Sequence, residues 1–148
     1  MPPRKGRLPV VLDTNVIVAQ LLSKTHRSAN SRVFDLWLVQ RQLQLIVSPP
    51  LIEEYLELLR RIGIAEDRIA RFHQRLLTAQ TITRINLGKR FQLSRDADDD
   101  FLLATAHAGR AQYLVTNDRD LLDILAEQRR PFRFEIVTPY NLLRTLKQ

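Results

Sequence analysis

Residues 8–15, LPVVLDTN, join a short apolar run to three polar residues. An apolar, β-branched run of this length favours a buried strand over residues 8–12, and Asp13 then follows directly where the strand ends. A similar run predicts a strand at residues 43–47, and further strands are predicted at residues 112–116 and 132–137, with a weaker one at residues 81–85. Runs that are apolar throughout are typical of strands in parallel sheets, which are buried on both faces.

The segments between these runs carry helical signals. They predict helices over residues 16–22, 31–41, 48–61, 66–79, 101–108, 118–128 and 139–146. Pro49 and Pro50 suit the first turn of one of these helices, and Gly109 suits the C-cap of another. Strands that alternate with helices favour an α/β fold with helices on both faces of a mainly parallel sheet of four to five strands. We expect a single domain over residues 1–148, with residues 1–7 as a flexible basic arm.

The composition excludes several classes of protein. The 148 residues are 45% apolar and 26% charged, which is enough for a core without disulfides or a structural metal. The chain has no cysteine, which excludes disulfide scaffolds, thiol nucleophiles and cysteine-ligated metal sites. No apolar stretch is long enough to span a membrane, and the N-terminus is unlike a signal peptide, so we expect a soluble cytoplasmic protein without a membrane partner.

Basic residues outnumber acidic ones. There are 23 Lys and Arg residues against 16 Asp and Glu, a net charge of +7, and 19 of the basic residues are arginine. The planar guanidinium group binds phosphate through two hydrogen bonds, so this composition is compatible with a polyanionic partner. Many arginine-rich proteins bind none, and charge alone therefore does not decide the function.

Two aspartates follow predicted strands. Asp13 comes directly after residues 8–12, and Asp118 follows residues 112–116 with one residue between. In open α/β sheets ligands bind at the carboxyl ends of the strands, near the point where the strand order reverses. Either aspartate could instead cap the helix that follows it.

Helical periodicity separates two further acids from their neighbours. In the helix over residues 48–61, Glu54 falls on the edge of the apolar stripe, whereas Glu53 and Glu57 fall opposite it. In the later helix, Asp99 precedes Leu102, Leu103 and Ala106 by three, four and seven residues and so opens their apolar face. Asp98 and Asp100 do not share this face and suit the positive end of the helix.

Asp13, Glu54, Asp99 and Asp118 are therefore expected to converge at one end of the sheet. Carboxylates gathered in a partly buried place repel one another unless cations lie among them. Mg²⁺ and Mn²⁺ prefer oxygen ligands and leave positions for water and phosphate. In phosphodiester cleavage such ions activate a water and stabilise the leaving oxygen, while arginines hold the polyanion.

Three segments of the chain resemble PIN-domain ribonucleases, and in particular bacterial PIN toxins related to VapC. They are VVLDTNVIV (residues 10–18), SPPLIEEYLELL (48–59) and DADDDFLLATAHAGRAQYLVTNDRDLL (96–122). They occur in the family's order and extend over nearly the whole chain. The resemblance implies an α/β/α fold, an Mg²⁺- or Mn²⁺-dependent endoribonuclease of a type II toxin–antitoxin system, a cognate antitoxin and a homodimer.

The resemblance also assigns roles to residues. The family's four catalytic and metal-binding acids match Asp13 in D-T-N, Glu54 six residues after Ser48, Asp99 in the segment that opens the alanine-rich helix, and Asp118 in V-T-x-D. Asp96 matches the first aspartate of the third motif, and Asn15 and Thr116 match polar positions that orient a carboxylate or a water. Ala97 departs from the proline that the family often has there. Asp13 and Asp99 are expected to do most of the metal binding.

Arginines are candidates for contact with RNA. Arg68, Arg71 and Arg75 share one face of the helix over residues 66–79, where they could hold phosphates or simply form a solvated face. Arg119 lies next to Asp118. The three histidines, His26, His73 and His107, lack the spacing of metal ligands.

The sequence bears on three other functions. A haloacid-dehalogenase-type phosphatase needs a second acid two residues after the first, where this chain has Asn15. A response-regulator receiver needs a lysine after a late strand, and none follows Thr116 or Val137 suitably. The stronger alternative is a PIN module with little or no catalysis that acts by binding RNA or protein.

Overall fold

The computed structural model describes residues 6–22, 28–87, 97–123 and 132–146, and for residues 97–100 it describes the backbone alone. Within these ranges the strands are β1 (Leu8–Leu12), β2 (Leu43–Val47), β3 (Ile82–Arg84), β4 (Tyr113–Val115) and β5 (Glu135–Val137). The helices are α1 (Thr14–Leu22), α2 (Ala29–Leu38), α3 (Pro49–Arg61), α4 (Glu66–Thr78), α5 (Ala97–Ala108), α6 (Arg119–Leu122) and α7 (Pro139–Thr145). The predicted α/β fold is confirmed.

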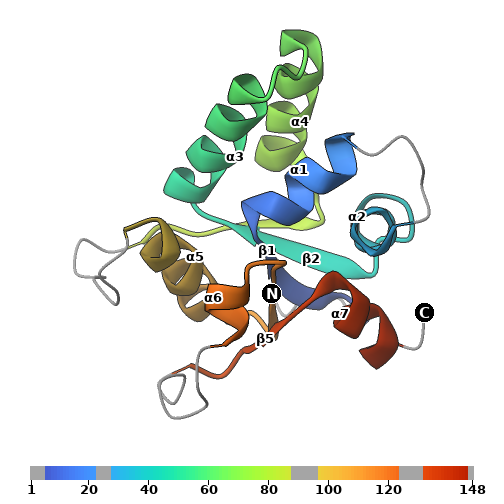
Figure 1. The fold of residues 1–148 in the computed structure, drawn as a ribbon, viewed down its shortest axis with the longest axis vertical. Coiled ribbons are helices and arrows are strands. Elements are labelled where there is room, and N and C mark those ends of the chain that lie inside the picture. Colours follow the sequence, from blue (N-terminus) through green and yellow to red (C-terminus); the bar gives the residue numbers. More distant parts are fainter. Residues whose placement is uncertain (1–5, 23–27, 88–96, 124–131, 147–148) are drawn as a thin grey trace.

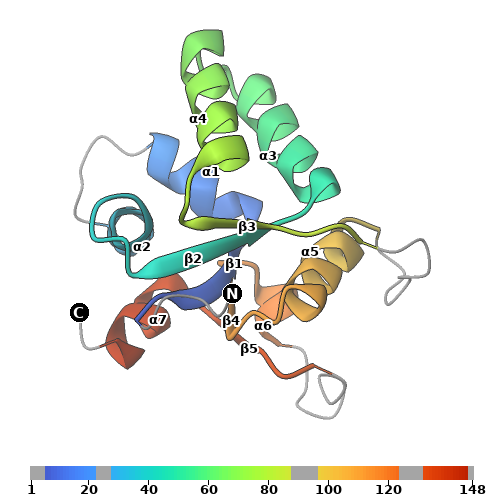
Figure 2. The same cartoon turned by 180° about the vertical axis from the view of Figure 1, so that it is seen from behind.

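The five strands form one sheet in the order β3-β2-β1-β4-β5, and every pairing in it is parallel. Figures 1 and 2 show α1, α3 and α4 on one side of this sheet and α5, α6 and α7 on the other. Helix α2 packs against both α1 and α7. The described sheet is thus entirely parallel, where the sequence predicted a mainly parallel one.

Strand β1 lies at the centre of the sheet. Its residues Val10, Val11 and Leu12 are fully buried, as expected for a strand covered by helices on both faces. The chain first adds β2 and β3 on one side of β1 and then adds β4 and β5 on the other side. The order therefore reverses between β1 and β4, and the carboxyl ends of these two strands mark the switch point where such sheets bind ligands.

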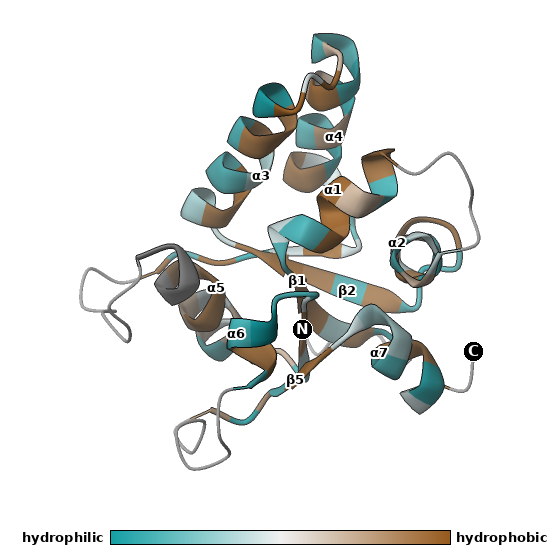
Figure 3. Ribbon diagram, viewed as in Figure 1, coloured by the Kyte–Doolittle hydropathy of each residue, from teal (hydrophilic) through white to brown (hydrophobic). Residues whose placement is uncertain are grey.

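An aromatic cluster fills the layer between α2 and α4. The Trp37 ring meets the rings of Phe34 and Phe72 edge-on, at centroid distances of 5.3 and 6.4 Å. The indole N–H of Trp37 donates to the carbonyl oxygen of Thr81, so this buried ring leaves no polar atom unsatisfied. Figure 3 shows the apolar sides of the helices turned toward the sheet. Phe34 and Trp37 therefore belong to the core.

The turn after α5 corrects one prediction. Gly109 follows the helix directly, but the left-handed backbone conformation belongs to Arg110, whose φ is 55°. A Cβ on Gly109 would lie 2.3 Å from Cγ2 of Ile46. Glycine is therefore required here because α5 packs closely on β2, and not because the helix cap needs a positive φ.

Several elements begin or end differently from the sequence prediction. Helix α2 starts at Ala29 and ends at Leu38 instead of spanning residues 31–41, and α5 starts at Ala97 instead of residue 101. The strand expected over residues 132–137 starts at Glu135, because its neighbour β4 has three residues and offers no longer ladder. The helix expected over residues 118–128 starts at Arg119 and ends at Leu122, where the N–H of Asp123 closes the last turn. Residues 124–128 of that prediction lie outside the described residues.

Arg7 is part of the folded structure. Its guanidinium group donates to Oε1 of Gln44 at 3.2 Å and to the carbonyl oxygen of Gln80 at 3.3 Å. Residues 1–5 of the predicted basic arm lie outside the described residues, so the arm stays a prediction there. No helix in the described ranges is both long enough and apolar enough to cross a membrane.

Candidate metal centre

The Asp13 carboxylate lies at the carboxyl end of β1 and is half-buried. Its Oδ1 accepts a hydrogen bond from the backbone N–H of Thr14 at 2.7 Å. Its Oδ2 accepts from the Thr116 hydroxyl at 2.6 Å and from the Asn15 side-chain amide at 3.1 Å. Both oxygens are thus oriented by donors that the protein provides. The structure brings Asn15 and Thr116 to the acid that the sequence expected them to support.

Sheet order explains why Thr116 reaches Asp13. Leu12 pairs with Val115 in the ladder between β1 and β4, and the N–H of Asp13 donates to the Val115 carbonyl oxygen at 2.8 Å. Thr116 also accepts a hydrogen bond from the N–H of Asp118 on its Oγ1 at 2.9 Å. Because that N–H occupies an acceptor site of the hydroxyl oxygen, the hydroxyl proton is directed to Asp13.

Glu54 joins the same region from α3. It is half-buried, whereas Glu53 and Glu57 on the same helix are exposed. Its Oε2 accepts a hydrogen bond from the Thr14 hydroxyl at 3.0 Å. Thr14 therefore binds two acids at once, Asp13 through its N–H and Glu54 through its hydroxyl. The sequence analysis missed Thr14, although its place within the D-T-N motif was a usable signal.

Tyr55 fixes α3 to the end of β1. Its side chain is fully buried, and its hydroxyl donates to the carbonyl oxygen of Leu12, the residue before Asp13. Burial, followed by the negative charges of Asp13 and Glu54, raises the pKa of the Tyr55 hydroxyl well above its usual range. Tyr55 therefore stays neutral beneath the two acids, and the sequence had given no reason to single it out.

Asp118 acts as the N-cap of α6. Its Oδ1 accepts a hydrogen bond from the N–H of Asp120 at 2.9 Å, so the capping role weighed from the sequence is present. Asp118 is nevertheless close enough to Asp13 that its charge contributes to the raised pKa of that acid. Capping uses one carboxylate oxygen and is compatible with a place in a metal centre.

Asp99 lies in the first turn of α5, and its side chain is outside the described residues, as is the whole of Asp96. Helix α5 leads from β3 to β4, so it begins at the carboxyl edge of the sheet, where Asp13 lies. A buried hydrogen bond of 2.7 Å joins the hydroxyls of Ser48 and Thr105. Since the Thr105 hydroxyl donates to the Phe101 carbonyl oxygen at 2.5 Å, Ser48 is the donor to Thr105, and this bond ties the start of α3 to α5.

The electrostatic state of Asp13 suits a cation. Burial raises the pKa of the Asp13 carboxyl above its usual range, the charge of Asp118 adds to the rise, and the hydrogen bonds that Asp13 accepts oppose it. A divalent cation at the carboxylate would favour the ionised form. The donors are all oxygens, the chemistry that Mg²⁺ and Mn²⁺ prefer. Among the described side chains no group of three or more His, Asp or Glu residues is placed to hold a metal ion. The part of Asp99 in the metal centre stays a prediction, because its side chain lies outside the described residues.

The arginines of α4 lie elsewhere. Arg68, Arg71 and Arg75 are exposed. Arg71 lies 3.6 Å from the Asp67 carboxylate, and Arg68 donates to the carbonyl oxygen of Leu21 near the end of α1, whereas Asp13 lies before the start of that helix. The structure does not bring these arginines to Asp13. Arg119 is exposed beside Asp118 and is the predicted RNA contact that remains near the acids.

A network of amides extends from Asn15. Its Oδ1 accepts hydrogen bonds from the backbone N–H and the side-chain amide of Asn117, at 3.1 and 3.4 Å. The same amide of Asn117 donates to Oδ1 of Asn30 on α2 at 2.9 Å. The sequence analysis did not assign Asn117 or Asn30, because hydrogen bonds between distant segments leave no local pattern. These bonds hold the Asn15 side chain so that its N–H group faces Asp13.

The family model described as PIN domain matches residues 9–120, which include β1, α3 and β4. The chain belongs to the PIN-domain family. PIN domains are typically nucleases and generally use divalent metals. The resemblance noted in the three sequence segments is thus confirmed at the level of the family.

Solved structures share this PIN fold. VapBC2 from Rickettsia felis, determined bound to a DNA fragment from their promoter, is 14% identical with a TM-score of 0.55, over 88% of this chain and 98% of that chain. PAE2754 from Pyrobaculum aerophilum is 20% identical with a TM-score of 0.53, over 98% of this chain and 95% of that chain. At these identities the likeness concerns the fold alone. A search of curated proteins found no match to this PIN domain.

Proposed function

We propose that this PIN domain is an Mg²⁺- or Mn²⁺-dependent endoribonuclease that cleaves RNA phosphodiester bonds. The observation that carries the proposal is the Asp13 carboxylate, which lies at the switch point of the sheet with both oxygens oriented by hydrogen bonds. Glu54 lies on α3 and Asp118 at the N-cap of α6, and both are near Asp13. Membership of a family that typically consists of nucleases supports the assignment.

In this proposal Asp13 and Asp99 make most of the contacts to the metal, and Glu54 and Asp118 complete the centre directly or through water. When bound, the metal would activate a water for attack on phosphorus and stabilise the leaving oxygen. The polar neighbours have a separate task. Thr14, Asn15 and Thr116 hold the Asp13 carboxylate in one orientation, so that little entropy is lost when a cation binds.

RNA is proposed as the substrate because the acids stand in an otherwise basic chain. The net charge of +7 favours a polyanion, and Arg119 lies beside Asp118 at the start of α6. An exposed arginine next to the metal would attract a phosphate of the RNA strand on either side of the phosphodiester that is cleaved.

We further propose that the protein is the toxin of a type II toxin–antitoxin system, acts as a homodimer and is inhibited by a cognate antitoxin. The fold it shares with VapBC2 of Rickettsia felis supports this biological role. Expression of the chain alone should arrest the growth of the host cell. Coexpression with a small antitoxin that is encoded nearby should restore growth. A host that grows normally while it accumulates intact protein would contradict the toxin assignment.

Nuclease activity is tested on defined transfer, ribosomal and messenger RNAs with Mg²⁺ or Mn²⁺. Asp13→Asn should lower the rate by more than about 100-fold, since it removes a charged ligand, and EDTA should abolish cleavage. Wild-type cleavage by Asp13→Asn would overturn the proposal. RNA retention without any metal-dependent cleavage would favour the alternative, a PIN module that acts by binding.

The chain provides a matched control in α3. Glu54→Gln should slow cleavage, whereas Glu53→Gln removes the same charge from the adjacent exposed position and should leave the rate unchanged. Equal rates for the two variants would exclude Glu54 from the centre. Asp99→Asn compared with Asp98→Asn and Asp100→Asn applies the same test to the start of α5.

A further inference from the structure

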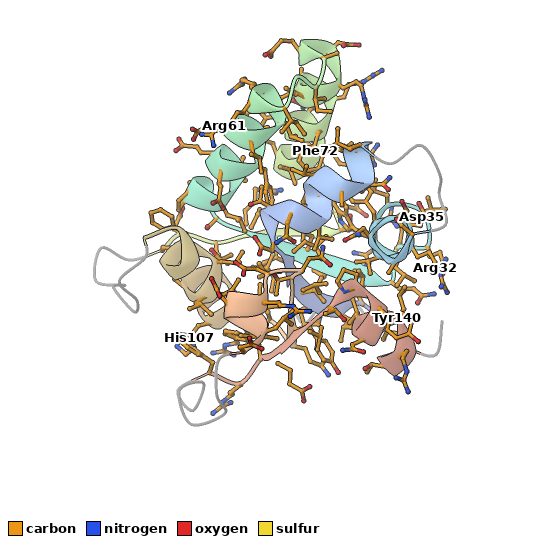
Figure 4. The ribbon with its side chains drawn as sticks, in the orientation of Figure 1. Arg32, Asp35, Arg61, Phe72, His107 and Tyr140 are labelled. Carbon is orange, nitrogen blue, oxygen red and sulfur yellow. The ribbon has the colours of Figure 1, made fainter. Side chains whose placement is uncertain are left out.

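A cavity of about 670 Å³ lies at the opposite edge of the sheet from Asp13. It is bordered by the end of α5 and by the residues that precede β4 and β5. The basic side chains of His107, Arg110 and Arg133 line it, together with Phe134 and small alanine side chains. Figure 4 shows His107 on the outer surface near the end of α5, away from the helix layer that holds Phe72.

The cavity and the acids are separated by the length of the central strands. In a parallel sheet all carboxyl ends share one edge and all amino ends share the other. Arg110 precedes β4 and Arg133 precedes β5, so both lie at the amino edge. The length of β1, five residues at roughly 3.3 Å each, separates this edge from Asp13. One phosphate therefore cannot contact both places.

Arg110 has an unusual backbone conformation for its residue type. Its φ is 55°, and one other described arginine, Arg41, has the same conformation with a φ of 54°. Residues other than glycine are strained in this left-handed backbone conformation. Arg41 uses its guanidinium group within the protein, because it donates to Oε1 of Gln80 at 3.4 Å. Arg110 has no such bond among the described residues and lines the cavity.

Arg133 is also unpaired. The ion pairs of the described residues involve Arg60, Arg61 and Arg71, and no described acid pairs with Arg110 or Arg133. Both side chains are exposed at the cavity. Two arginines that line one cavity repel each other and hold charge that no acid among the described residues neutralises. An anion between them would remove that repulsion.

The size and walls of the cavity narrow the choice of anion. Its volume falls within the usual range for small-molecule sites, and exceeds what an isolated inorganic ion needs. Phe134 stacks on Phe132 at a centroid distance of 5.1 Å and is 4% exposed, so it forms part of an apolar wall. Guanidinium groups beside an apolar wall suit a phosphate that carries a nucleoside.

We propose that this cavity binds a nucleotide phosphate through Arg110 and Arg133. The phosphate belongs either to an RNA strand, at a nucleotide distant from the scissile bond, or to a free nucleotide. The RNA version rests on the proposed function, since it adds a second contact for the same substrate. It explains why two arginines without an ion-pair partner among the described residues, one of them in a strained conformation, line the same cavity.

Binding is measured on the full chain in EDTA, so that no cleavage takes place. The probes are a labelled short single-stranded RNA and adenosine monophosphate, each titrated over a range of salt concentrations. The Arg110→Gln/Arg133→Gln double variant should bind RNA on the order of tenfold more weakly. The slope of log affinity against log salt should fall by about 1.4, since each phosphate contact on a single strand contributes roughly 0.7.

The matched control is the Arg41→Gln/Arg60→Gln double variant, which loses the same charge at exposed positions away from the cavity. It should keep most of the affinity. Equal losses in the two double variants would overturn the proposal, because general charge would then explain binding. Weakened binding of adenosine monophosphate as well as RNA identifies a free-nucleotide site, whereas a loss confined to RNA identifies a strand contact.

A further variant separates binding from stability. A cation at the C-terminal end of a helix interacts favourably with the partial negative charge there. Arg110 could therefore stabilise α5 without binding any phosphate. Arg110→Gly relieves the left-handed strain and should raise the melting temperature while it binds RNA as weakly as Arg110→Gln. Arg110→Gly with wild-type affinity and salt slope would overturn the phosphate assignment. An absence of nuclease activity would not affect this result, since the readout is binding.

Discussion

The two edges of the sheet differ in how their charged side chains are satisfied. At the carboxyl edge, three hydrogen bonds from Thr14, Asn15 and Thr116 fix the orientation of Asp13. At the amino edge, Arg110 and Arg133 have no ion-pair partner among the described residues. An acid that is held in place suits a small cation with strict geometry, whereas free arginines suit a larger anion that must bind and leave.

Among substitutions of the residues that orient Asp13, rather than of Asp13 itself, the largest effect is expected from Thr116. Thr116→Val removes the hydroxyl that donates to Asp13 and accepts from Asp118, and should lower the cleavage rate by about 10- to 100-fold. Thr116→Ser keeps the hydroxyl and should retain most of the rate. Steady-state cleavage at saturating metal measures both variants. Full activity of Thr116→Val would show that this orientation does not matter.

Cation binding provides the next test of the contrast between the edges. Mn²⁺ at about 100 times its Kd should stabilise the wild-type protein by about 2.7 kcal/mol, because it binds the folded state. Asp13→Asn should lose most of this stabilisation, and Arg110→Gln should keep it. Thermal unfolding with and without Mn²⁺ measures the difference. Equal stabilisation of wild type and Asp13→Asn would place the cation elsewhere.

Helix α5 connects the two edges, and its packing is tested at Gly109. Gly109→Ala places a Cβ 2.3 Å from Ile46 Cγ2, and the overpacking should cost about 1–3 kcal/mol of unfolding free energy. In an Ile46→Ala background the same substitution should cost much less, since the opposing atom is gone. Chemical denaturation of the four proteins gives the coupling. A cost of Gly109→Ala that does not depend on Ile46 would contradict the close contact.

The smallest expected effect is the pH dependence from Tyr55 beneath the acids. Tyr55→Phe removes the donor to the Leu12 carbonyl oxygen and should cost about 1 kcal/mol near neutral pH. Because the folded-state pKa of Tyr55 is raised, the stabilisation is complete below the unfolded pKa of about 10 and is lost as the pH rises through the folded value. Urea denaturation should therefore show that the difference in unfolding free energy between wild type and Tyr55→Phe is smaller at alkaline than at neutral pH. An advantage that grows with pH would mean that the sign is wrong.

Local periodicity was sufficient to predict much of the fold. Short apolar runs located the central strands β1, β2 and β4 because these are largely buried on both faces. Helical spacing distinguished half-buried Glu54 from exposed Glu53 and Glu57. The strand predicted at residues 132–137 was too long because its extent depends on the partner strand β4. Gly109 was assigned to a cap because the sequence does not show how closely α5 approaches Ile46.

The candidate site could be predicted as a set of acids but not as a set of contacts. The roles of Asp13, Glu54, Asp99 and Asp118 as metal ligands stay predictions. Two spatial relations had no local signal: the Tyr55 bond to Leu12 and the amide network through Asn117. Each joins groups that are brought together by sheet order rather than by sequence spacing.

By itself, the sequence determined the alternation of strands and helices, the acid at the end of the first strand and the family to which the chain belongs. These features depend on residues within one or two turns of each other, or on motifs that can be read in order. The tertiary structure alone decided that β4 lies beside β1 and brings Thr116 to Asp13, and that Arg110 and Arg133 share a cavity at the other edge. Such contacts between distant segments arise only when the whole sheet and its helices pack together, because no local interaction specifies which strands become neighbours.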